Sequence, residues 1–244
     1  MMDDNFAIIF ERVSKKFRRG QKLLLKEALI DIFMPQKTEP FWALKDISFK
    51  IKKGETVGII GNNGSGKSTI LKLIAGVMYP TKGKVVVNGR INPLIELGAG
   101  FHPELTGREN IYLNGTILGL TIPQIDERFD EIVSFAELGD FIDSPLKHYS
   151  SGMYMRLGFS VAIFTEPKIL LVDEILAVGD REFQKKCFKK MDEFKKNNIT
   201  IVIVTHEMES VRKFCDRVIL LSDGIIKDDG RPDKLLSEYL KLIK

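Results

Sequence analysis

Hydrophobic and polar positions follow different repeats in different parts of the chain. Continuous apolar runs at residues 56–60, 169–172 and 199–204 are each followed by polar or glycine-rich residues. Runs of this kind, separated by helices, are typical of parallel strands that are covered on both faces. Because ligands bind beyond the carboxyl ends of such strands, we expect the polar residues after the three runs to meet at one edge of the sheet.

Other segments show alternating or helical patterns. Apolar and polar residues alternate at 6–15, 44–57 and 84–91, which predicts an antiparallel sheet. Residues 107–165 have mostly helical spacing of apolar positions. Residues 232–244 predict a last amphipathic helix. The chain therefore combines a parallel sheet, an antiparallel sheet and a helical region.

The composition excludes several classes of protein. The chain has 244 residues, of which 44% are hydrophobic and 29% charged, so it is neither disordered nor collagen-like. Its two cysteines, Cys187 and Cys215, are too few for a disulfide framework and share no metal-ligand spacing, so we expect reduced thiols. No apolar run approaches the ~20 residues of a membrane-spanning helix, and the first residues do not resemble a secretion signal. We expect a protein that stays inside the cell and does not span a membrane.

Positive charge is concentrated near the N-terminus. The formal net charge is only +4, but six Lys and Arg residues lie between Lys15 and Lys26 with no acid among them. Such a segment is either a solvated surface loop or a basic segment near lipid head groups or acidic partner loops, and the sequence leaves both open.

The first apolar run leads into a glycine-rich loop that matches G-x-x-x-x-G-K-[ST] and opens a helix. Glycines let successive backbone N–H groups point at phosphate oxygens, and the helix adds its positive end. Lys67 can neutralise the outer phosphates and the Ser68 hydroxyl can ligate Mg²⁺. The alternative is a glycine turn that happens to precede a helix. The pattern favours a nucleoside triphosphate site formed by Gly61, Asn62, Asn63, Gly64, Ser65, Gly66, Lys67, Ser68 and Thr69.

Two acidic residues follow the second apolar run. Asp173, at the end of a buried strand, can hold Mg²⁺ through water. Glu174 is placed to polarise a water that attacks the γ-phosphate. An acidic pair after a strand can also cap a helix, but beside a phosphate loop we favour the catalytic interpretation.

Residues 149–153, Tyr-Ser-Ser-Gly-Met, resemble the signature motif of the nucleotide-binding subunits of ATP-binding cassette (ABC) transporters, usually Leu-Ser-Gly-Gly-Gln. The match lies in the Ser-x-Gly core and in the position before the Asp173 strand, and three positions depart from the motif. The likeness spans nearly the whole chain. It implies an α/β P-loop ATPase over 1–244 with a RecA-like parallel-sheet core, an antiparallel β subdomain, an inserted helical subdomain at about 107–165 and a basic insertion at 18–41.

The resemblance also implies roles for single residues. Lys67, Glu174 and the switch histidine His206 would be catalytic, and Phe17 would stack on adenine. Residues 176–180 would form the D-loop, with Asp180 near the nucleotide. Most members carry a glutamine that touches Mg²⁺ and the permease, and here Glu96 or its neighbour takes that place as a metal ligand. The signature residues Ser150, Ser151 and Gly152 would bind the nucleotide of a second copy, because they cannot complete their own site.

Two long stretches, 95–110 and 173–180, are similar to the ATP-binding subunits that export O-antigen and teichoic-acid polysaccharides. This similarity implies a homodimer that binds ATP and Mg²⁺ and powers export of a lipid-linked polysaccharide. It would act with an integral-membrane permease at the cytoplasmic face of the inner membrane, without nucleic acid. The C-terminal carbohydrate-binding domain of some such subunits is missing here, so the chain is either of the shorter type or cut. Export of a lipid or drug, and a soluble ABC ATPase that acts on nucleic acid, are the alternatives.

Overall fold

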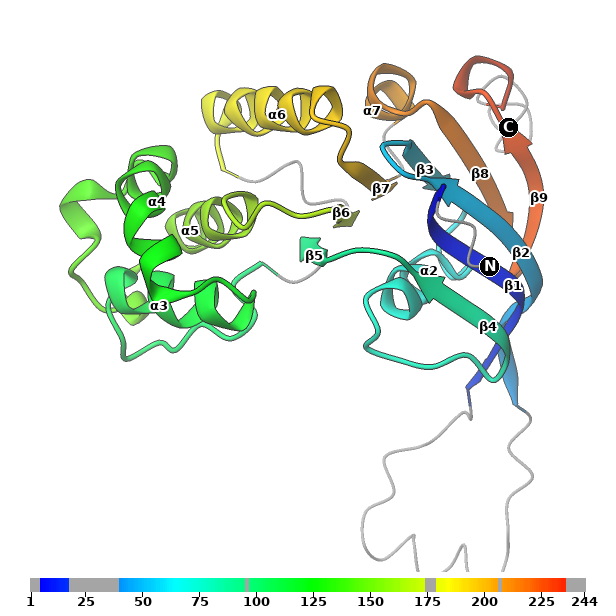
Figure 1. Ribbon diagram of the computed structural model, residues 1–244, viewed down its shortest axis with the longest axis horizontal. Helices are drawn as coiled ribbons and strands as arrows, with labels where there is room; N and C mark the ends of the chain where they lie inside the picture. The colour runs from blue at the N-terminus through cyan, green and yellow to red at the C-terminus, as the bar shows by residue number, and fades with distance from the viewer. Residues whose placement is uncertain (1–4, 18–39, 95–96, 174–178, 206–207, 236–244) are drawn as a thin grey trace, which may run out of the picture.

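The computed structural model describes residues 5–17, 40–94, 97–173, 179–205 and 208–235, and all statements below concern these residues (Figure 1). Most of the predicted basic insertion at 18–41 and the last nine residues of the predicted C-terminal helix lie outside this part of the chain. No helix of the described residues is long and apolar enough to cross a lipid bilayer.

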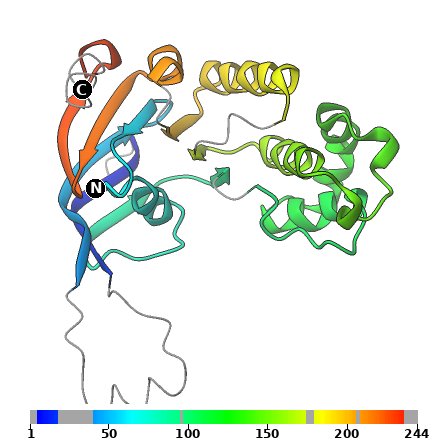
Figure 2. The ribbon, with the colours of Figure 1, turned by 180° about the vertical axis from the view of Figure 1, so that it is seen from behind.

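A six-stranded sheet forms the centre of the fold. Its strand order is β5-β6-β7-β3-β8-β9, and every neighbouring pair is parallel except β8 and β9. Both faces of β3 are covered, which explains why all of its residues are buried. The strands are β3 (Thr56–Ile60), β5 (Ile91–Leu94), β6 (Ile169–Asp173), β7 (Thr200–Val204), β8 (Arg217–Ser222) and β9 (Ile225–Gly230). The three predicted parallel strands are confirmed, and β8 and β9, seen from behind in Figure 2, extend the sheet beyond them.

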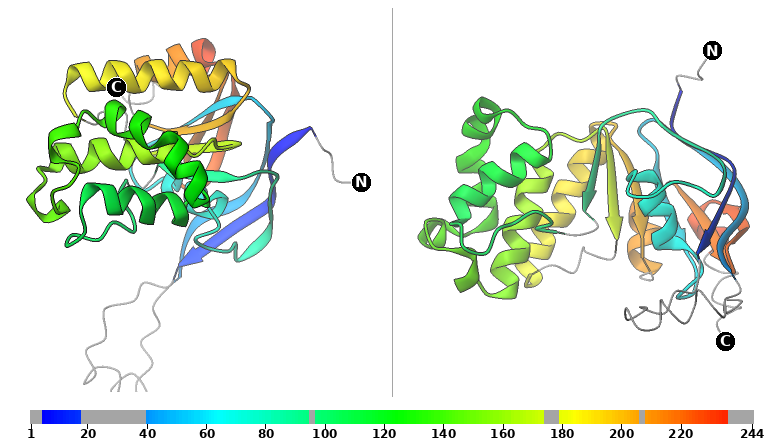
Figure 3. Two further views of the ribbon diagram at one scale, coloured as in Figure 1. Left: turned by 60° about the vertical axis from the view of Figure 1, so that its left-hand side comes forward. Right: turned by 90° about the horizontal axis from the view of Figure 1, so that it is seen from below.

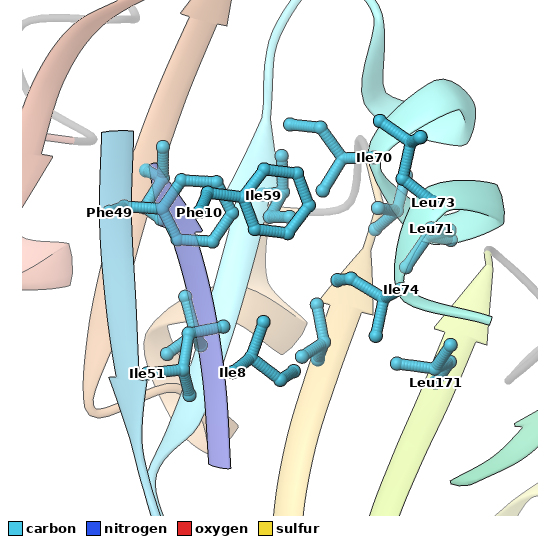
Figure 4. Close-up of a cluster of buried hydrophobic side chains, with 14 of the residues drawn as sticks. Ile8, Phe10, Phe49, Ile51, Ile59, Ile70, Leu71, Leu73, Ile74 and Leu171 are labelled. Atoms are coloured by element: carbon cyan, nitrogen blue, oxygen red, sulfur yellow. The ribbon is translucent and has the colours of Figure 1, made fainter. Parts of the chain in front are cut away.

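A second, antiparallel sheet has the order β2-β1-β4, with β1 (Phe6–Phe17), β2 (Phe41–Lys52) and β4 (Lys82–Val87). Its inner face packs with α2 (Lys67–Ile74) on one face of the central sheet, where the Phe10 and Phe49 rings stack 4.4 Å apart (Figure 4). The prediction that residues 84–91 belong wholly to this sheet is wrong. The chain leaves it after Val87, and Ile91 begins β5 in the parallel sheet, because Ile91 pairs with Ile169 of β6.

Three helices stand to one side of the two sheets (Figure 3). They are α3 (Gly107–Ile117), α4 (Ile122–Ala136) and α5 (Ser151–Ile163), with short 3₁₀ turns η1 (Gly139–Phe141) and η2 (Leu146–His148) between α4 and α5. The Thr106 hydroxyl accepts from the N–H of Glu109, and the Glu109 carboxylate accepts from the N–H of Thr106, which fixes the start of α3. The helices share their own apolar cluster, as the spacing within 107–165 predicts.

The second face of the central sheet is covered by α5, α6 (Arg181–Lys196) and α7 (Met208–Phe214). Phe159 of α5 lies at the centre of this layer, with its ring centroid 6.2 Å from that of Phe135 and 6.1 Å from that of Phe183. Because α5 contributes to this cluster and to that of α3 and α4, it joins the helical region to the sheet.

We expect Phe159→Ala to lower the free energy of unfolding by about 3–5 kcal/mol, because it removes a fully buried ring and leaves a cavity. Urea unfolding followed by circular dichroism measures this difference. Phe141→Ala is the matched control, since that ring is 51% exposed, and it should cost about 1 kcal/mol or less. Equal losses for the two variants would contradict the role of Phe159 in joining the two regions.

Candidate nucleotide site

The phosphate-binding loop predicted from the sequence links the end of β3 to the start of α2. Gly61 has a φ of 152°, and a Cβ there would lie 2.0 Å from the carbonyl oxygen of Leu221 in β8. Gly66 has a φ of 110°, and its Cβ would lie 2.6 Å from the carbonyl oxygen of Ala43 in β2. Both positions therefore require glycine, because the loop is pressed against neighbouring strands of both sheets.

Lys67 begins α2 and is held beneath the loop. Its ammonium donates to the carbonyl oxygens of Gly61 at 2.8 Å and Asn62 at 3.1 Å, and the side chain is only 8% exposed. These bonds tie the helix start to the loop and keep a positive charge where phosphates would bind. Ser65 is also buried, and its hydroxyl has no hydrogen-bond partner among the described residues. A bound phosphate oxygen could satisfy that hydroxyl.

The acid predicted to act with this loop reaches the same cleft. Asp173 ends β6 and pairs in register with Val204 at the end of β7, as expected for neighbouring parallel strands. The Ser68 hydroxyl and the Asp173 carboxylate supply the hard oxygen ligands that suit Mg²⁺. The cleft has a volume of about 530 Å³ and is lined by Phe17, Phe41, Ala43, Asn63, Gly64, Gly66, Lys67, Ser68, Thr69, Asp173 and Val204.

Two aromatic rings form the wall of the cleft away from the phosphate loop. Phe17 ends β1 and pairs with Phe41, the first residue of β2, and the two are 37% and 49% exposed. Phe17 thus lines the same cleft as the phosphate loop, and its stacking on adenine, which the resemblance to the family implies, stays a prediction. Phe41 was missed by the sequence reasoning, because only the pairing of β1 with β2 brings it beside Phe17.

The signature residues form a different site. The Ser150 hydroxyl accepts from the N–H of Met153 at 3.2 Å and caps α5, while Ser151 is exposed at the first position of the helix. The depression around them has a volume of about 780 Å³ and shares no lining residue with the phosphate cleft. It is lined by Ser150, Ser151, Gly152, Met153, Met155, Arg156, Gly179 and Asp180.

Asp180 lies in this second depression and not in the cleft of its own phosphate loop. Its carboxylate caps α6 by accepting from the N–H groups of Phe183 at 2.9 Å and Glu182 at 3.0 Å, and it also pairs with Arg156. The Phe183 N–H, with help from Arg156, holds the pKa of Asp180 below its ordinary value. Arg156 also contacts Glu137 at 2.9 Å, so the ends of α4 and α6 are both tied to α5.

Three predicted residues, Glu96, Glu174 and His206, lie outside the described residues, as do positions 176–178 of the predicted D-loop. Among the residues that the structure describes, no group of three or more His, Cys, Asp or Glu side chains could hold a metal ion. Cys187 and Cys215 are free and buried, and burial raises the pKa of each thiol to about 12.

Comparison with known proteins gives consistent matches. The family described as "ABC transporter" matches residues 44–177, more than half of the chain. The O-antigen export system ATP-binding protein RfbB of Myxococcus xanthus is 49% identical over 245 residues, which cover 97% of this chain and 56% of the relative. RfbB of Klebsiella pneumoniae is 51% identical over 85% of this chain and 84% of its own length. The teichoic acids export ATP-binding protein TagH of Listeria innocua is 44% identical over 100% of this chain and 72% of its own length.

Solved structures show the same architecture. A dimeric ATP-binding cassette in a post-hydrolysis state bound to ADP and Pi superposes with a TM-score of 0.74 at 25% identity, over 92% of this chain and 98% of that one. An ATP-binding subunit of an ABC transporter gives a TM-score of 0.76 at 24% identity, over 96% of this chain and 93% of that one. The predicted α/β P-loop fold is confirmed.

We expect Gly61→Ala to lower the affinity for a fluorescent nucleotide analogue at least tenfold, because the new methyl group must push the loop away from Leu221. Equilibrium titration measures the affinity, and thermal unfolding reports the accompanying loss of stability. Gly76→Ala is the control. Gly76 also has a positive φ of 72°, but open space surrounds its Cβ position, so it should cost only about 1–2 kcal/mol of stability and leave binding unchanged. Unaltered binding by Gly61→Ala would contradict the close approach.

Proposed function

Since this chain belongs to the ABC transporter family, we propose that it is the ATP-hydrolysing subunit of an exporter that moves a lipid-linked polysaccharide across the cytoplasmic membrane. The convergence of Lys67 and Asp173 on one glycine-lined cleft supports ATP binding and hydrolysis. The O-antigen and teichoic-acid class of cargo rests on the relatives, which are 44–51% identical to this chain.

In this proposal the loop amides and Lys67 bind the β- and γ-phosphates, and Phe17 with Phe41 holds the adenine. Ser68 and Asp173 would hold Mg²⁺, which when bound neutralises charge that develops on the phosphates. Glu174 would accept the proton of the attacking water, and His206 would orient the γ-phosphate; the resemblance to the family supports both roles. Asp173 ends β6 and lines the same cleft as the phosphate loop.

We propose that two copies of the chain enclose two ATP molecules. The phosphate cleft of one subunit would be completed by Ser151 and Gly152 of the other. This arrangement is supported by the two depressions, which share no lining residue within one chain, and by the dimeric neighbour. In this dimer the signature residues of one subunit would contact the γ-phosphate bound to the other. Hydrolysis would remove that contact and release the dimer, as in other nucleotide-dependent order switches.

The permease would dock in an apolar groove of about 280 Å³ between the central sheet and the helical region. Gly158 lets α5 approach the loop before α3, since a Cβ there would lie 2.8 Å from the N atom of Gly98. Ile117 is 59% exposed and Val77 is 73% exposed, so apolar surface lies open at the rim. An amphipathic cytoplasmic helix of the permease fits such a groove, and it would hold the subunit at the cytoplasmic face of the membrane. The groove is lined by Lys72, Ala75, Val77, Pro93, Leu97, Gly98, Ala99, Asn114, Ile117, Leu118, Gly158 and Ala162.

We expect Glu174→Gln to bind ATP, to form a stable dimer and to hydrolyse ATP at least 100-fold more slowly, because a general base contributes about 10²–10⁴-fold. Gel filtration with light scattering measures the mass with and without ATP, and phosphate release measures turnover. Lys67→Ala should stay monomeric under the same conditions, because it loses nucleotide affinity. A monomer of Glu174→Gln at saturating Mg-ATP would contradict the scheme.

Mixing two inactive variants tests whether the signature acts across the interface. Lys67→Ala damages only the phosphate cleft, and Ser151→Arg, at an exposed position, damages only the signature. A heterodimer contains one site with both parts intact, so the mixture should release phosphate while each variant alone is inactive. Up to half of the mixed subunits form heterodimers, so we expect about a quarter of the wild-type rate. If the signature served its own chain, mixing would restore nothing.

A further inference from the structure

A basic and aromatic surface lies where the antiparallel sheet ends. It consists of Lys15 and Lys16 of β1, Trp42 of β2, Lys82 of β4 and Tyr79, three residues before β4. The ammonium groups of Lys16 and Lys82 lie 5.7 Å and 5.9 Å from the Trp42 ring centroid, so both cations are near the same indole. Lys15 donates to the carbonyl oxygen of Tyr79 at 2.7 Å and fixes the tyrosine segment against the sheet.

The lysines of this surface have no acidic partner in the part of the chain that the structure describes. Within the described residues no carboxylate forms an ion pair with Lys15, Lys16 or Lys82. On the same sheet Arg12 forms an ion pair with Asp46 at 3.4 Å. Tyr79 is 82% exposed, the highest value among the large hydrophobic side chains. The surface thus has three ammonium groups without an ion pair among the described residues, beside the exposed Tyr79 and the half-buried Trp42, a combination that suits an interfacial anionic ligand.

The position of this surface beside the proposed permease groove indicates that it faces the membrane. Tyr79 follows Val77, which lines the proposed permease groove, so the two surfaces adjoin along the segment after α2. In Figure 1 the end of β1 and the starts of β2 and β4 lie at the lower edge of the described part of the molecule, whereas α6 runs along the upper edge. A permease helix docked in the groove would therefore bring this surface toward the membrane, a step that rests on the proposed function.

We propose that Lys15, Lys16 and Lys82, with Trp42 and Tyr79, bind the anionic phospholipid headgroups of the membrane leaflet around the permease. The ammonium groups contact lipid phosphates, and the two aromatic rings take the interfacial position that amphipathic rings favour at a bilayer. The contact gives the subunit a second attachment beside the permease groove and fixes its orientation on the membrane. Lys15 also lies 5.4 Å from the Phe17 ring centroid, so this attachment borders the nucleotide cleft.

Vesicle binding by the purified full chain, without permease and without ATP, tests this proposal. We expect co-sedimentation with phosphatidylcholine vesicles that contain 30% phosphatidylglycerol and none with pure phosphatidylcholine. The triple variant Lys15→Gln, Lys16→Gln, Lys82→Gln should bind the anionic vesicles roughly 100-fold more weakly, since each lysine near an anionic surface contributes about fivefold. Replacing the same three lysines by arginine should retain binding.

A control variant removes the same charge from the opposite edge of the molecule. Lys185→Gln, Lys189→Gln, Lys196→Gln changes three exposed lysines of α6 and should leave vesicle binding within twofold. Equal losses for the two triple variants would mean that net charge alone drives binding, and would overturn the proposal. So would displacement from vesicles by saturating ATP, because the lysines would then hold nucleotide, and so would failure of the wild-type chain to bind anionic vesicles.

ATP-dependent dimerisation of Glu174→Gln is measured in the same preparation. If dimers form but vesicles are not bound, only the lipid inference falls. If vesicles are bound but no dimer forms, the proposed function falls and the lipid surface stands by itself.

Discussion

The close approach of the phosphate loop to both sheets is the constraint on which the rest of the site depends. Gly61 passes against Leu221 of β8 and Gly66 against Ala43 of β2, and neither position has room for a Cβ. Because β3 is held between β7 and β8, the loop leaves the sheet at the level where β6 delivers Asp173. The short bonds from Lys67 to the loop carbonyls then set the start of α2. A shift of β3 relative to β6 would therefore move the loop away from Asp173.

The two proposed halves of the nucleotide site do not meet within one chain. The phosphate cleft lies at the edge of the parallel sheet, and the signature residues lie at the start of α5 beside Asp180. Arg156 bridges Glu137 and Asp180, and Lys186 contacts Glu137 at 2.7 Å, so this second half is a rigid junction of α4, α5 and α6. The Lys186 ammonium holds the pKa of Glu137 below its ordinary value, which keeps the junction charged near neutral pH. We infer that this surface, which ion pairs hold in place, is suited to bind the nucleotide of a second subunit.

The proposed attachments to the permease and to the lipid lie on the segments that follow α2. That helix begins at the phosphate loop with Lys67, and Lys72 and Ala75 near its other end line the groove, so α2 connects the two proposed sites. α5 likewise connects the signature residues to the groove, because it begins at Ser151 and its residues Gly158 and Ala162 line the groove. Nucleotide binding and partner docking thus lie at opposite ends of the same two helices.

The sequence by itself determined the loop, the parallel strands, the helical region and the family, and each of these was confirmed. Such features depend on local patterns: glycine spacing, continuous apolar runs and a signature beside an acidic strand. Tertiary structure alone decided that Phe41 joins Phe17 in the cleft, that Ile91 begins a strand of the parallel sheet, and that β8 supports Gly61. It also decided that Asp180 lies with the signature and that Lys16 and Lys82 share one indole. These placements come from strand pairing and from contacts between residues far apart in the chain, which no local pattern encodes.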